Sequence, residues 1–414
     1  LITTTQDPAN WPVALPDLAS RLRAARVTRL GPPDDALLRA VLVKQFSDRQ
    51  ITVDEPTIAY MLTRMERSFD AARRLVDDID RKAVYPEAIL RNLGEAGAFA
   101  MHLPGYGTAA PRLRPAIEAM QCVGEKCLST SFCTWCQDAL GWYIFNSDNA
   151  ALKDTLGPAI ATGAKLGGTG LSNPMKSFFG IERLRLKGER VKGGYRVKGL
   201  LPWVSNLGDD HYFGAIFETD NETRVMAVID CAEPAVKLSM DSEFVALDGT
   251  RTYAIQIRDL FVPDAIVLAD PIDEYLPKIR AGFVLLQAGM AFGIIQSSID
   301  LMKQMRVPLE HVNKFLEDQP EDFEAQLAAM QDTVWRLCET PYESDPDYWR
   351  EVISARLVAG ETTVKAAHAA MLHSGARGYV INGEAQRRLR EAYFVAIVTP
   401  ATKQLRKMLS DMSH

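Results

Sequence analysis

Hydrophobic and polar positions change their spacing twice along the chain, and these changes divide it into three parts. Between residues 86 and 146 apolar side chains recur every three or four positions, which predicts helices. Between residues 166 and 265 they alternate or form short runs, as strands do. After Pro263 the helical spacing returns. The helices expected in the first part cover residues 86–97, 112–127 and 129–146.

The middle part has the clearest strand pattern. Residues 184–187 and 195–198 alternate with period two, and Lys192-Gly193-Gly194 stands between them. Glycines at such a junction supply the backbone freedom that a tight turn needs, so the sequence predicts a hairpin. Further strands are expected at residues 212–217, 224–229 and 252–257.

The last part predicts a bundle of long helices. Gly282, Gly289 and Gly293 fall within the first of them, where small residues permit close packing of helices. The four helices are expected at residues 279–306, 323–339, 348–374 and 383–410. The sequence therefore predicts a four-helix bundle after the strands.

A glycine-rich stretch, Gly168-Thr169-Gly170-Leu171-Ser172, opens the middle part. Its small residues let the backbone approach a ligand, and Ser172 adds a hydroxyl. The predicted hairpin returns Trp203 and Ser205 toward Ser172. An aromatic face with two hydroxyls suits a flat heteroaromatic ring. Spacing alone, however, favours an ordinary β-domain with a core tryptophan and turn hydroxyls.

Three ordered motifs resemble those of the acyl-CoA dehydrogenase family. Leu171-Ser172-Asn173-Pro174 and Trp203-Val204-Ser205-Asn206 are similar to its Leu-Thr-Glu-Pro and Trp-Ile-Thr-Asn signatures. Asp248-Gly249-Thr250-Arg251, followed by residues 258–263, resembles the segment that ends the family's β-domain. The resemblance covers about residues 85–414. It implies an α+β multidomain fold, with a helical domain at 85–165, a β-barrel-like middle domain at 166–270 and a four-helix bundle at 271–414.

The family resemblance also implies a cofactor and a substrate. The cofactor would be FAD, with FMN as the alternative, and the substrate a small molecule of the acyl-CoA type. Trp135 and Gln137 lie on a helix that resembles the one lining the family's acyl pocket, although a core helix explains them equally well. The family further implies a homo-oligomer, a dimer or a tetramer. The implied cofactor-binding residues are Leu171, Ser172, Trp203, Ser205 and, at the pyrophosphate, Arg306.

The catalytic base of the family is missing from its usual position. Alignment of Arg390-Glu391-Ala392 with the family's Arg-Asp-Ala places Thr399 at the base position, and a hydroxyl cannot act as a base near neutral pH. The alternative position in the family falls near Phe283. Glu391 and Glu361 are nearby acids, but carboxylates are common on helix surfaces. The catalytic residue is therefore unknown.

Three functional hypotheses follow. The first is an FAD-dependent acyl-CoA dehydrogenase-like oxidoreductase with a displaced base. The second is a flavin-dependent monooxygenase or oxidase of the same fold, which needs no such base. The third is a non-catalytic or chimeric protein. The retained ring-binding signatures favour the first.

The first 84 residues resemble a different family. Helices are expected at residues 36–46, 55–64 and 69–81, and the stretch is similar to the end of the AAA+ module in regulatory relatives of the replication initiators. By that resemblance Arg21 matches the arginine finger and Arg67 the sensor-2 arginine. The chain has no Gly-x-x-x-x-Gly-Lys-Ser/Thr motif, so ATPase activity is not expected. The abrupt join without a linker suggests a chimeric or mis-joined sequence.

Composition narrows the remaining possibilities. Positive and negative charges are mixed and the net charge is −6, so no nucleic-acid partner is expected. No apolar run approaches membrane-spanning length and the start does not resemble a signal peptide, so a cytoplasmic protein without membrane contact is expected. Cys133 and Cys136 have redox-motif spacing but are interpreted as core thiols. The six histidines are scattered, which predicts no metal site.

Overall fold

The computed structural model describes residues 35–48, 58, 84–106, 110–240, 242, 244–381 and 383–412. The chain forms two compact units, Leu1–Ile79 and Asp80–His414. In the first unit, helix α2 (Asp35–Asp48) confirms the helix expected at residues 36–46. Its Leu38 and Leu42 are buried. The other two helices expected there, except Ile58, and the sites Arg21 and Arg67 lie outside the described residues.

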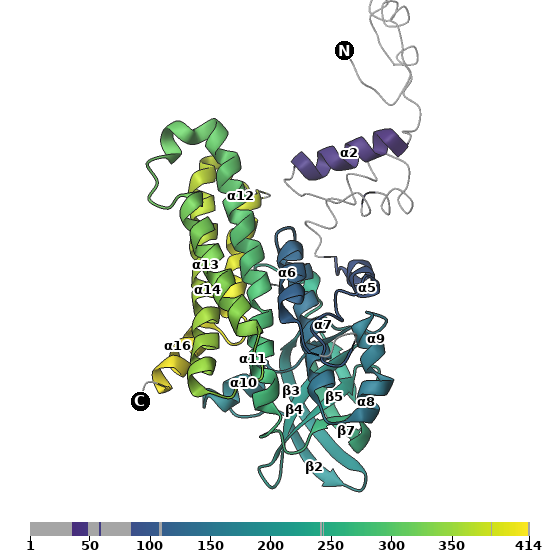
Figure 1. Ribbon diagram of the computed structural model, residues 1–414. Helices are drawn as coiled ribbons and strands as arrows, with labels where there is room; N and C mark the ends of the chain where they lie inside the picture. The colour runs from purple at the N-terminus through teal and green to yellow at the C-terminus, as the bar shows by residue number, and fades with distance from the viewer. Residues whose placement is uncertain are drawn as a thin grey trace, which may run out of the picture. The chain divides into compact units, whose positions relative to one another are not determined.

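The second unit begins with helices that confirm the expected 3–4 spacing. They are α5 (Glu87–Glu95), α6 (Leu113–Gly124), α7 (Leu128–Asn146), α8 (Ala150–Thr155) and α9 (Gly157–Ala161). Helix α7 is buried over almost its whole length, because it lies between the other helices and the sheet (Figure 1). It therefore positions side chains toward both halves of the unit.

The middle region is one mixed sheet with the strand order β6-β7-β3-β2-β4-β5-β8, and β1 pairs with β4. The expected hairpin is confirmed: β2 and β3 pair antiparallel with Arg190 opposite Tyr195, and Gly193 in the turn has φ of 80°. The described pairings form an open path, where the sequence suggested a barrel-like domain. The strands are β1 (Gly167–Thr169), β2 (Lys187–Val191), β3 (Gly194–Val204), β4 (Tyr212–Thr219), β5 (Arg224–Asp230), β6 (Val236–Ser239), β7 (Tyr253–Pro263) and β8 (Val267–Ala269).

The two faces of the sheet belong to different cores. Ile216 on β4 packs in the core that the helices share, whereas its neighbours Ala215 and Phe217 pack in a second core built from the strands. This alternation follows from the period of two in a strand. The sheet is thus attached to the helices by one apolar face.

The C-terminal region is the expected bundle, but two of the predicted helices are divided. The first consists of α11 and α12, which meet at Gln287, and the last consists of α15 and α16. Pro400 cannot donate a backbone hydrogen bond and restricts Thr399, so residues 398–401 leave the helix. The helices are α11 (Leu276–Leu286), α12 (Ala288–Asn313), α13 (Pro320–Cys338), α14 (Pro346–Ser374), α15 (Glu384–Ile397) and α16 (Thr402–Asp411).

Glycines bring α12 against α6, as the sequence predicted. A Cβ at Gly293 would lie 2.7 Å from the backbone of Gly124, and one at Gly289 would lie 2.8 Å from the carbonyl oxygen of Ile117. Neither backbone atom can move aside as the end of a side chain could. The close crossing therefore depends on glycine at both positions.

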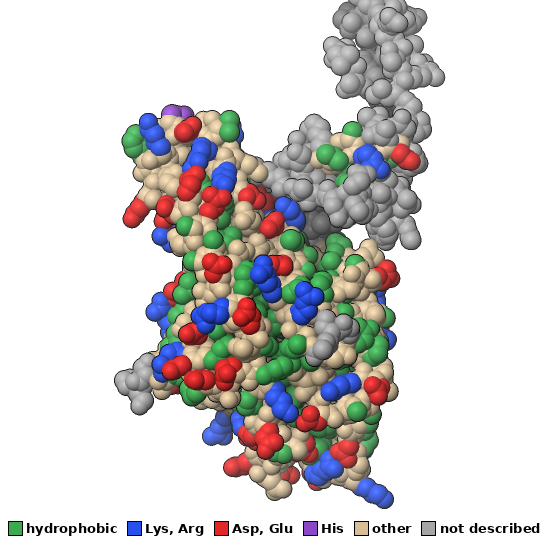
Figure 2. Space-filling view, viewed as in Figure 1, with side chains coloured by type: hydrophobic (Ala, Val, Ile, Leu, Met, Phe, Trp, Pro, Cys, Tyr) green, Lys and Arg blue, Asp and Glu red, His purple; other side chains and the backbone are tan. Residues whose placement is uncertain are grey.

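The stretch Leu276–Asn313 is long and apolar enough to cross a membrane, contrary to the expectation that no such run exists. Its most apolar window is 94% buried within the protein. Packing against α6, α7 and α14 accounts for this apolarity. On the visible face of the second unit, acidic and basic side chains are intermixed (Figure 2).

Candidate functional site

Two hydroxyl groups from distant parts of the chain meet where the sheet and the bundle join. Helix α10 (Ser172–Phe178) begins at Ser172, the last residue of the glycine-rich stretch. The Oγ of Ser172 lies 3.1 Å from the Oγ1 of Thr399, in the segment between α15 and α16. The residue expected beside the ring and the residue at the usual base position are thus hydrogen-bonded to each other.

The glycine-rich stretch lies against the end of β3. A Cβ at Gly168 would lie 2.1 Å from the carbonyl oxygen of Ser205, so only glycine fits there. Ser205 is buried, and its Oγ is 2.6 Å from the Oγ1 of Thr252 rather than hydrogen-bonded to Ser172. Trp203 on β3 is 53% exposed, which excludes the core tryptophan of the plain β-domain interpretation. Leu171 is buried.

A row of aromatic rings spans α15, α7 and α11. The rings of Phe394 and Phe132 are 4.6 Å apart, those of Phe132 and Trp135 are stacked at 5.6 Å, and those of Trp135 and Phe283 meet at 5.1 Å. The indole of Trp135 also donates to the carbonyl oxygen of Phe283 over 3.3 Å. Phe394 is one turn before the segment that carries Thr399. The row therefore joins α15, α7 and α11 through apolar ring contacts, one helical turn from the segment of Thr399.

Gln137 has contacts that indicate a structural role. Its side chain is fully buried, and its Nε2 donates to the carbonyl oxygens of Ile160 and Lys165 over 2.8 and 2.9 Å. Its Oε1 accepts from the backbone N–H of Gly167 over 2.8 Å. The amide thereby fastens the start of β1 to α7. Trp135, two residues away, lies in the aromatic row instead.

The two acids considered as substitute bases are engaged elsewhere. Glu391 is buried, with Oε2 at 3.0 Å from Nη1 of Arg388 and Oε1 at 3.4 Å from Nη1 of Arg387. Glu361 is on the surface, where Arg406 donates to it. Neither carboxylate has a hydrogen bond to Ser172 or Thr399 in the described part of the chain. The position of Glu391 indicates a structural role.

Arg306, expected at the cofactor pyrophosphate, is half-exposed on α12. Its Nη1 and Nη2 each lie 2.7 Å from an oxygen of Glu321 on α13. This bidentate contact lowers the pKa of Glu321 to about 2. Within one chain the guanidinium is therefore committed to a carboxylate, and an anionic ligand would have to compete for it.

Cys133 and Cys136 are both buried and carry free thiols. Burial raises the pKa of each thiol well above its ordinary value, which disfavours the reactive thiolate. Their interpretation as core thiols is confirmed. Among the described residues, no group of three or more His, Cys, Asp or Glu side chains could hold a metal ion.

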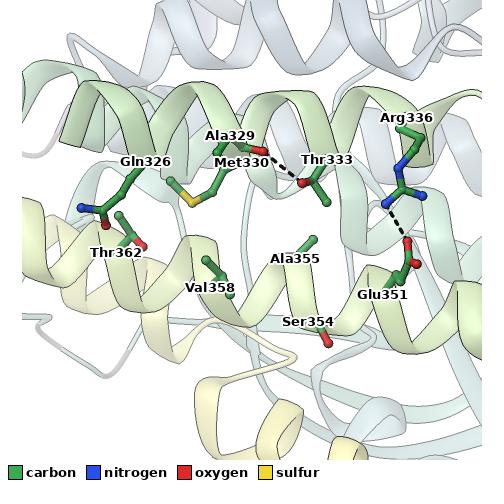
Figure 3. Close-up of a pocket in the computed structure, with 10 residues that line it drawn as sticks. All are labelled: Gln326, Ala329, Met330, Thr333, Arg336, Glu351, Ser354, Ala355, Val358 and Thr362. Atoms are coloured by element: carbon green, nitrogen blue, oxygen red, sulfur yellow. Dashed lines mark hydrogen bonds and ion pairs between the residues drawn. The ribbon is translucent and has the colours of Figure 1, made fainter. Parts of the chain in front are cut away.

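A groove of about 480 Å³ lies between α13 and α14 (Figure 3). Apolar side chains such as Met330 and Val358 line its middle, and the ion pair of Arg336 with Glu351 closes one end. The groove shares no lining residue with the hydroxyl pair or the aromatic row. The reacting groups of the candidate site therefore lie elsewhere.

Comparison with known families identifies the fold. The family model "Acyl-CoA dehydrogenase, N-terminal domain" matches residues 61–164, and "Acyl-CoA dehydrogenase, C-terminal domain" matches residues 272–408. Together they cover more than half of the chain. The first match begins at residue 61, so it extends into the stretch that was compared with the AAA+ module.

Individual relatives agree with this assignment. The chain is 21% identical over 335 residues to benzylmalonyl-CoA dehydrogenase of Aromatoleum aromaticum, covering 77% of this chain and 87% of the relative. Butyryl-CoA dehydrogenase of Megasphaera elsdenii has a similar structure, with a TM-score of 0.71, 15% identity and coverage of 93% and 99%. A glutaryl-CoA dehydrogenase from Mycobacterium smegmatis in complex with FADH2 gives a TM-score of 0.65, 17% identity and coverage of 92% and 94%. The chain therefore belongs to the acyl-CoA dehydrogenase family of flavin-dependent oxidoreductases.

Proposed function

We propose that the protein oxidises an acyl-CoA-type substrate with FAD as the hydride acceptor. The flavin ring would lie beside Ser172, Thr399 and the exposed indole of Trp203. The observation that carries this proposal is the contact of 3.1 Å between the hydroxyls of Ser172 and Thr399. Family resemblance assigns one of these positions to the ring and the other to the base, and the fold brings together residues 227 positions apart.

The side chains at this place fit a neutral, planar ring. Trp203 is 53% exposed, and the face of an indole can stack on a planar ring. Ser172 and Thr399 can each donate or accept a hydrogen bond. At the other end of the proposed cofactor the fit is weaker, because Arg306 is paired with Glu321.

When bound, FAD supplies the acceptor for a hydride from the acyl chain. The protein's own groups would bind and orient the thioester. The hydroxyl pair would offer hydrogen bonds at the reacting face, and the aromatic row near the segment of Thr399 would offer apolar contacts. A hydroxyl has too high a pKa to remove a proton efficiently at neutral pH. We therefore infer slow oxidation of ordinary acyl-CoA esters compared with a relative that has a carboxylate base.

The absence of a carboxylate contact at the hydroxyl pair, within the described residues, favours a second candidate function. This candidate is a flavin-dependent monooxygenase or oxidase of this fold. As a monooxygenase, with its flavin reduced by an external electron donor, it needs no base for the α-proton. Glu391, which could have served as a substitute, is held by Arg387 and Arg388. The two candidates share the ring site. In the first, acyl-CoA would reduce the flavin, and in the second an external donor would reduce it before oxygen reacts.

The visible absorption spectrum of the purified protein, before and after anaerobic addition of acyl-CoA esters, tests both candidates. Oxidised flavin that bleaches on addition establishes the oxidation of acyl-CoA. Flavin that stays oxidised, but consumes oxygen after chemical reduction while modifying the acyl-CoA, supports the second candidate. A colourless protein that does not take up FAD or FMN would contradict both.

Other proposals concern assembly and location. The family resemblance supports a homo-oligomer, which size-exclusion chromatography with light scattering would measure. The cytoplasmic location rests on the sequence pattern alone and remains a prediction. For residues 1–84, the AAA+ resemblance remains a prediction. Nucleotide-binding measurements on the full chain would test it, with no ATP hydrolysis expected.

A further inference from the structure

Arg356 on α14 is a buried cation without a carboxylate partner among the described residues. Its side chain is 3% exposed. Its Nε donates to Oε1 of Gln287 over 2.7 Å, and its Nη2 donates to the carbonyl oxygen of Val395 over 2.6 Å. Arginine is seldom fully buried unless a charge is paired with it. In the described part of the chain this guanidinium donates to neutral oxygens, so its role is to be sought in the segments to which those oxygens belong.

Gln287 connects this guanidinium to the candidate site. It is fully buried at the junction of α11 and α12. Its Nε2 donates to the carbonyl oxygen of Thr399 over 2.9 Å. The hydroxyl of the same threonine lies 3.1 Å from Ser172. A continuous path thus runs from Arg356 through Gln287 and Thr399 to Ser172.

Because arginine can only donate, it fixes the donor-to-acceptor direction of the hydrogen bonds along this path. A guanidinium can donate hydrogen bonds but cannot accept them. The Gln287 amide must therefore turn its oxygen toward Arg356, and this leaves its NH₂ group facing Thr399. An amide without such a neighbour could rotate by half a turn and present its oxygen to the Thr399 carbonyl, where the two acceptors would repel each other.

The same guanidinium also holds the end of α15. Val395 belongs to the last turn of this helix, whose final carbonyl groups have no partner within the helix. A cation at a helix C-terminus is favoured by the helix dipole. Arg356 therefore fixes the end of α15 directly and the following segment, residues 398–401, through Gln287.

We propose that Arg356 and Gln287 are positioning residues, which hold Thr399 against Ser172 and so fix the place where the acyl thioester meets the flavin ring. This inference rests on the proposed function for its meaning in catalysis. The positioning itself is a property of the chain. It can be measured with or without a cofactor.

The sharpest test is Gln287→Glu. The carboxylate keeps an acceptor for Arg356 and gives it a counter-ion, but it loses the N–H that donates to Thr399. We expect the variant to fold and to take up flavin. The affinity for acyl-CoA, measured through the change that binding causes in the flavin spectrum, should weaken about tenfold, as expected for the loss of one hydrogen bond. The matched control is Gln331→Glu on α13, whose amide contacts Gln121 away from the site; its binding should match the wild type.

A second measurement does not depend on flavin. Hydrogen–deuterium exchange should become faster in residues 398–405 of Gln287→Glu, and stay unchanged in α13. Arg356→Lys, which retains a donor for Gln287, should lie between the wild type and Arg356→Met in this exchange. Unchanged exchange at residues 398–405 in both Gln287→Glu and Arg356→Met would overturn the positioning role. A colourless wild-type protein would contradict the proposed function only, because the exchange result stands independently.

Discussion

Two buried arginines in the C-terminal bundle are stabilised in opposite ways. Arg388 on α15 lies 2.8 Å from Glu384 and 3.0 Å from Glu391, and it also donates to the carbonyl oxygen of Gly124. Among the described residues, Arg356 on α14 donates to the neutral oxygens of Gln287 and Val395 and has no carboxylate partner. Within that part of the chain the first cation is neutralised, and the second is not.

Arg388 belongs to a structural ion-pair cluster with Arg387, Glu384 and Glu391, whereas Arg356 begins the proposed positioning path to Ser172. Burial alone would raise the pKa of Glu384, but Arg388 and Arg387 lower it overall, so the carboxylate stays ionised and paired. Burial removes water from the Arg356 guanidinium and lowers its pKa to about 10. The paired guanidinium groups of Arg387 and Arg388 fasten α15 to carbonyl oxygens of the α6–α7 turn. Neutral groups, in contrast, lead from Arg356 to the hydroxyl pair. The groups at and behind the proposed ligand site are instead hydroxyl, amide and aromatic groups.

Removal of a carboxylate from the structural cluster should have the largest effect. In Glu391→Gln the buried Arg388 loses one of its two counter-charges, and breaking such a pair costs about 3 kcal/mol or more. We expect the free energy of unfolding in urea to fall by that amount, while flavin reduction per bound flavin stays unchanged. Glu361→Gln is the control, because its exposed pair with Arg406 should contribute under about 1 kcal/mol. Loss of flavin reduction without loss of stability would instead make Glu391 the base.

Opening the aromatic row should affect stability almost as much. Phe283→Ala removes a buried ring that contacts Trp135, and such truncations cost about 3 kcal/mol. The space created adjoins the proposed substrate site, so acyl-CoA esters with longer chains should bind more tightly relative to short ones than in the wild type. Titrations followed by the flavin spectrum measure this ratio. An unchanged ratio would show that the row does not border the acyl chain; Phe261→Ala, on the exposed face of β7, is the control.

The buried pair of His102 and Asp138 should make the stability of the protein depend on pH. His102 and Asp138 are fully buried, their Nδ1 and Oδ1 are 3.8 Å apart, and neither atom has a hydrogen bond. Burial raises the pKa of Asp138 well above 3.8, so its contribution to stability is full below that pH and is lost as pH rises through the folded value. Burial lowers the pKa of His102 to about 4 from 6.5, so its contribution is lost as pH falls through this window.

Asp138→Asn isolates the carboxyl contribution. Relative to the wild type, the variant should gain stability as pH rises from 4 to 7, by at most about 1.4 kcal/mol per pH unit. Urea unfolding of both proteins at several pH values measures the difference. A difference that does not change with pH would contradict the assignment of a protonated, buried Asp138.

The smallest change is expected at the hydroxyl pair. Ser172→Ala removes one partly buried hydrogen bond, which contributes about 1 kcal/mol or less to stability. We expect an unfolding curve close to that of the wild type, together with a shifted flavin absorption band. An unaltered band in a protein saturated with flavin would place the ring away from Ser172.

Much of the fold could be predicted from the sequence because its signals are periodic. The spacing of apolar residues predicted α7, the β2–β3 hairpin and the long helices, and Gly293 predicted a close crossing of helices. Two breaks were missed. The continuous apolar pattern through Gln287 obscured the junction of α11 and α12, although a lone glutamine among apolar residues was a usable signal. Pro400 was a signal for the break after α15.

The candidate site was only partly predictable, since it depends on contacts between distant residues. The motif around Ser172 and the position of Thr399 were identified separately, and no spacing argument could show that their hydroxyls meet. Gln137 looked like a ligand group, but its amide is used by the backbone around β1. Arg356 lies in no recognisable sequence motif. Its proposed role follows from its burial and its hydrogen-bond partners, which only the structure shows.

Thr399→Glu tests the central claim most directly, because it places a carboxylate at the position that the family resemblance assigns to the base. If the flavin ring and the acyl thioester meet at the Ser172–Thr399 pair, anaerobic reduction of the bound flavin by butyryl-CoA should become faster by about 100-fold or more, as expected for a general base. The rate is measured by stopped-flow absorption on protein saturated with flavin. A variant that binds flavin and butyryl-CoA like the wild type, yet reduces flavin no faster, would contradict this account of the site.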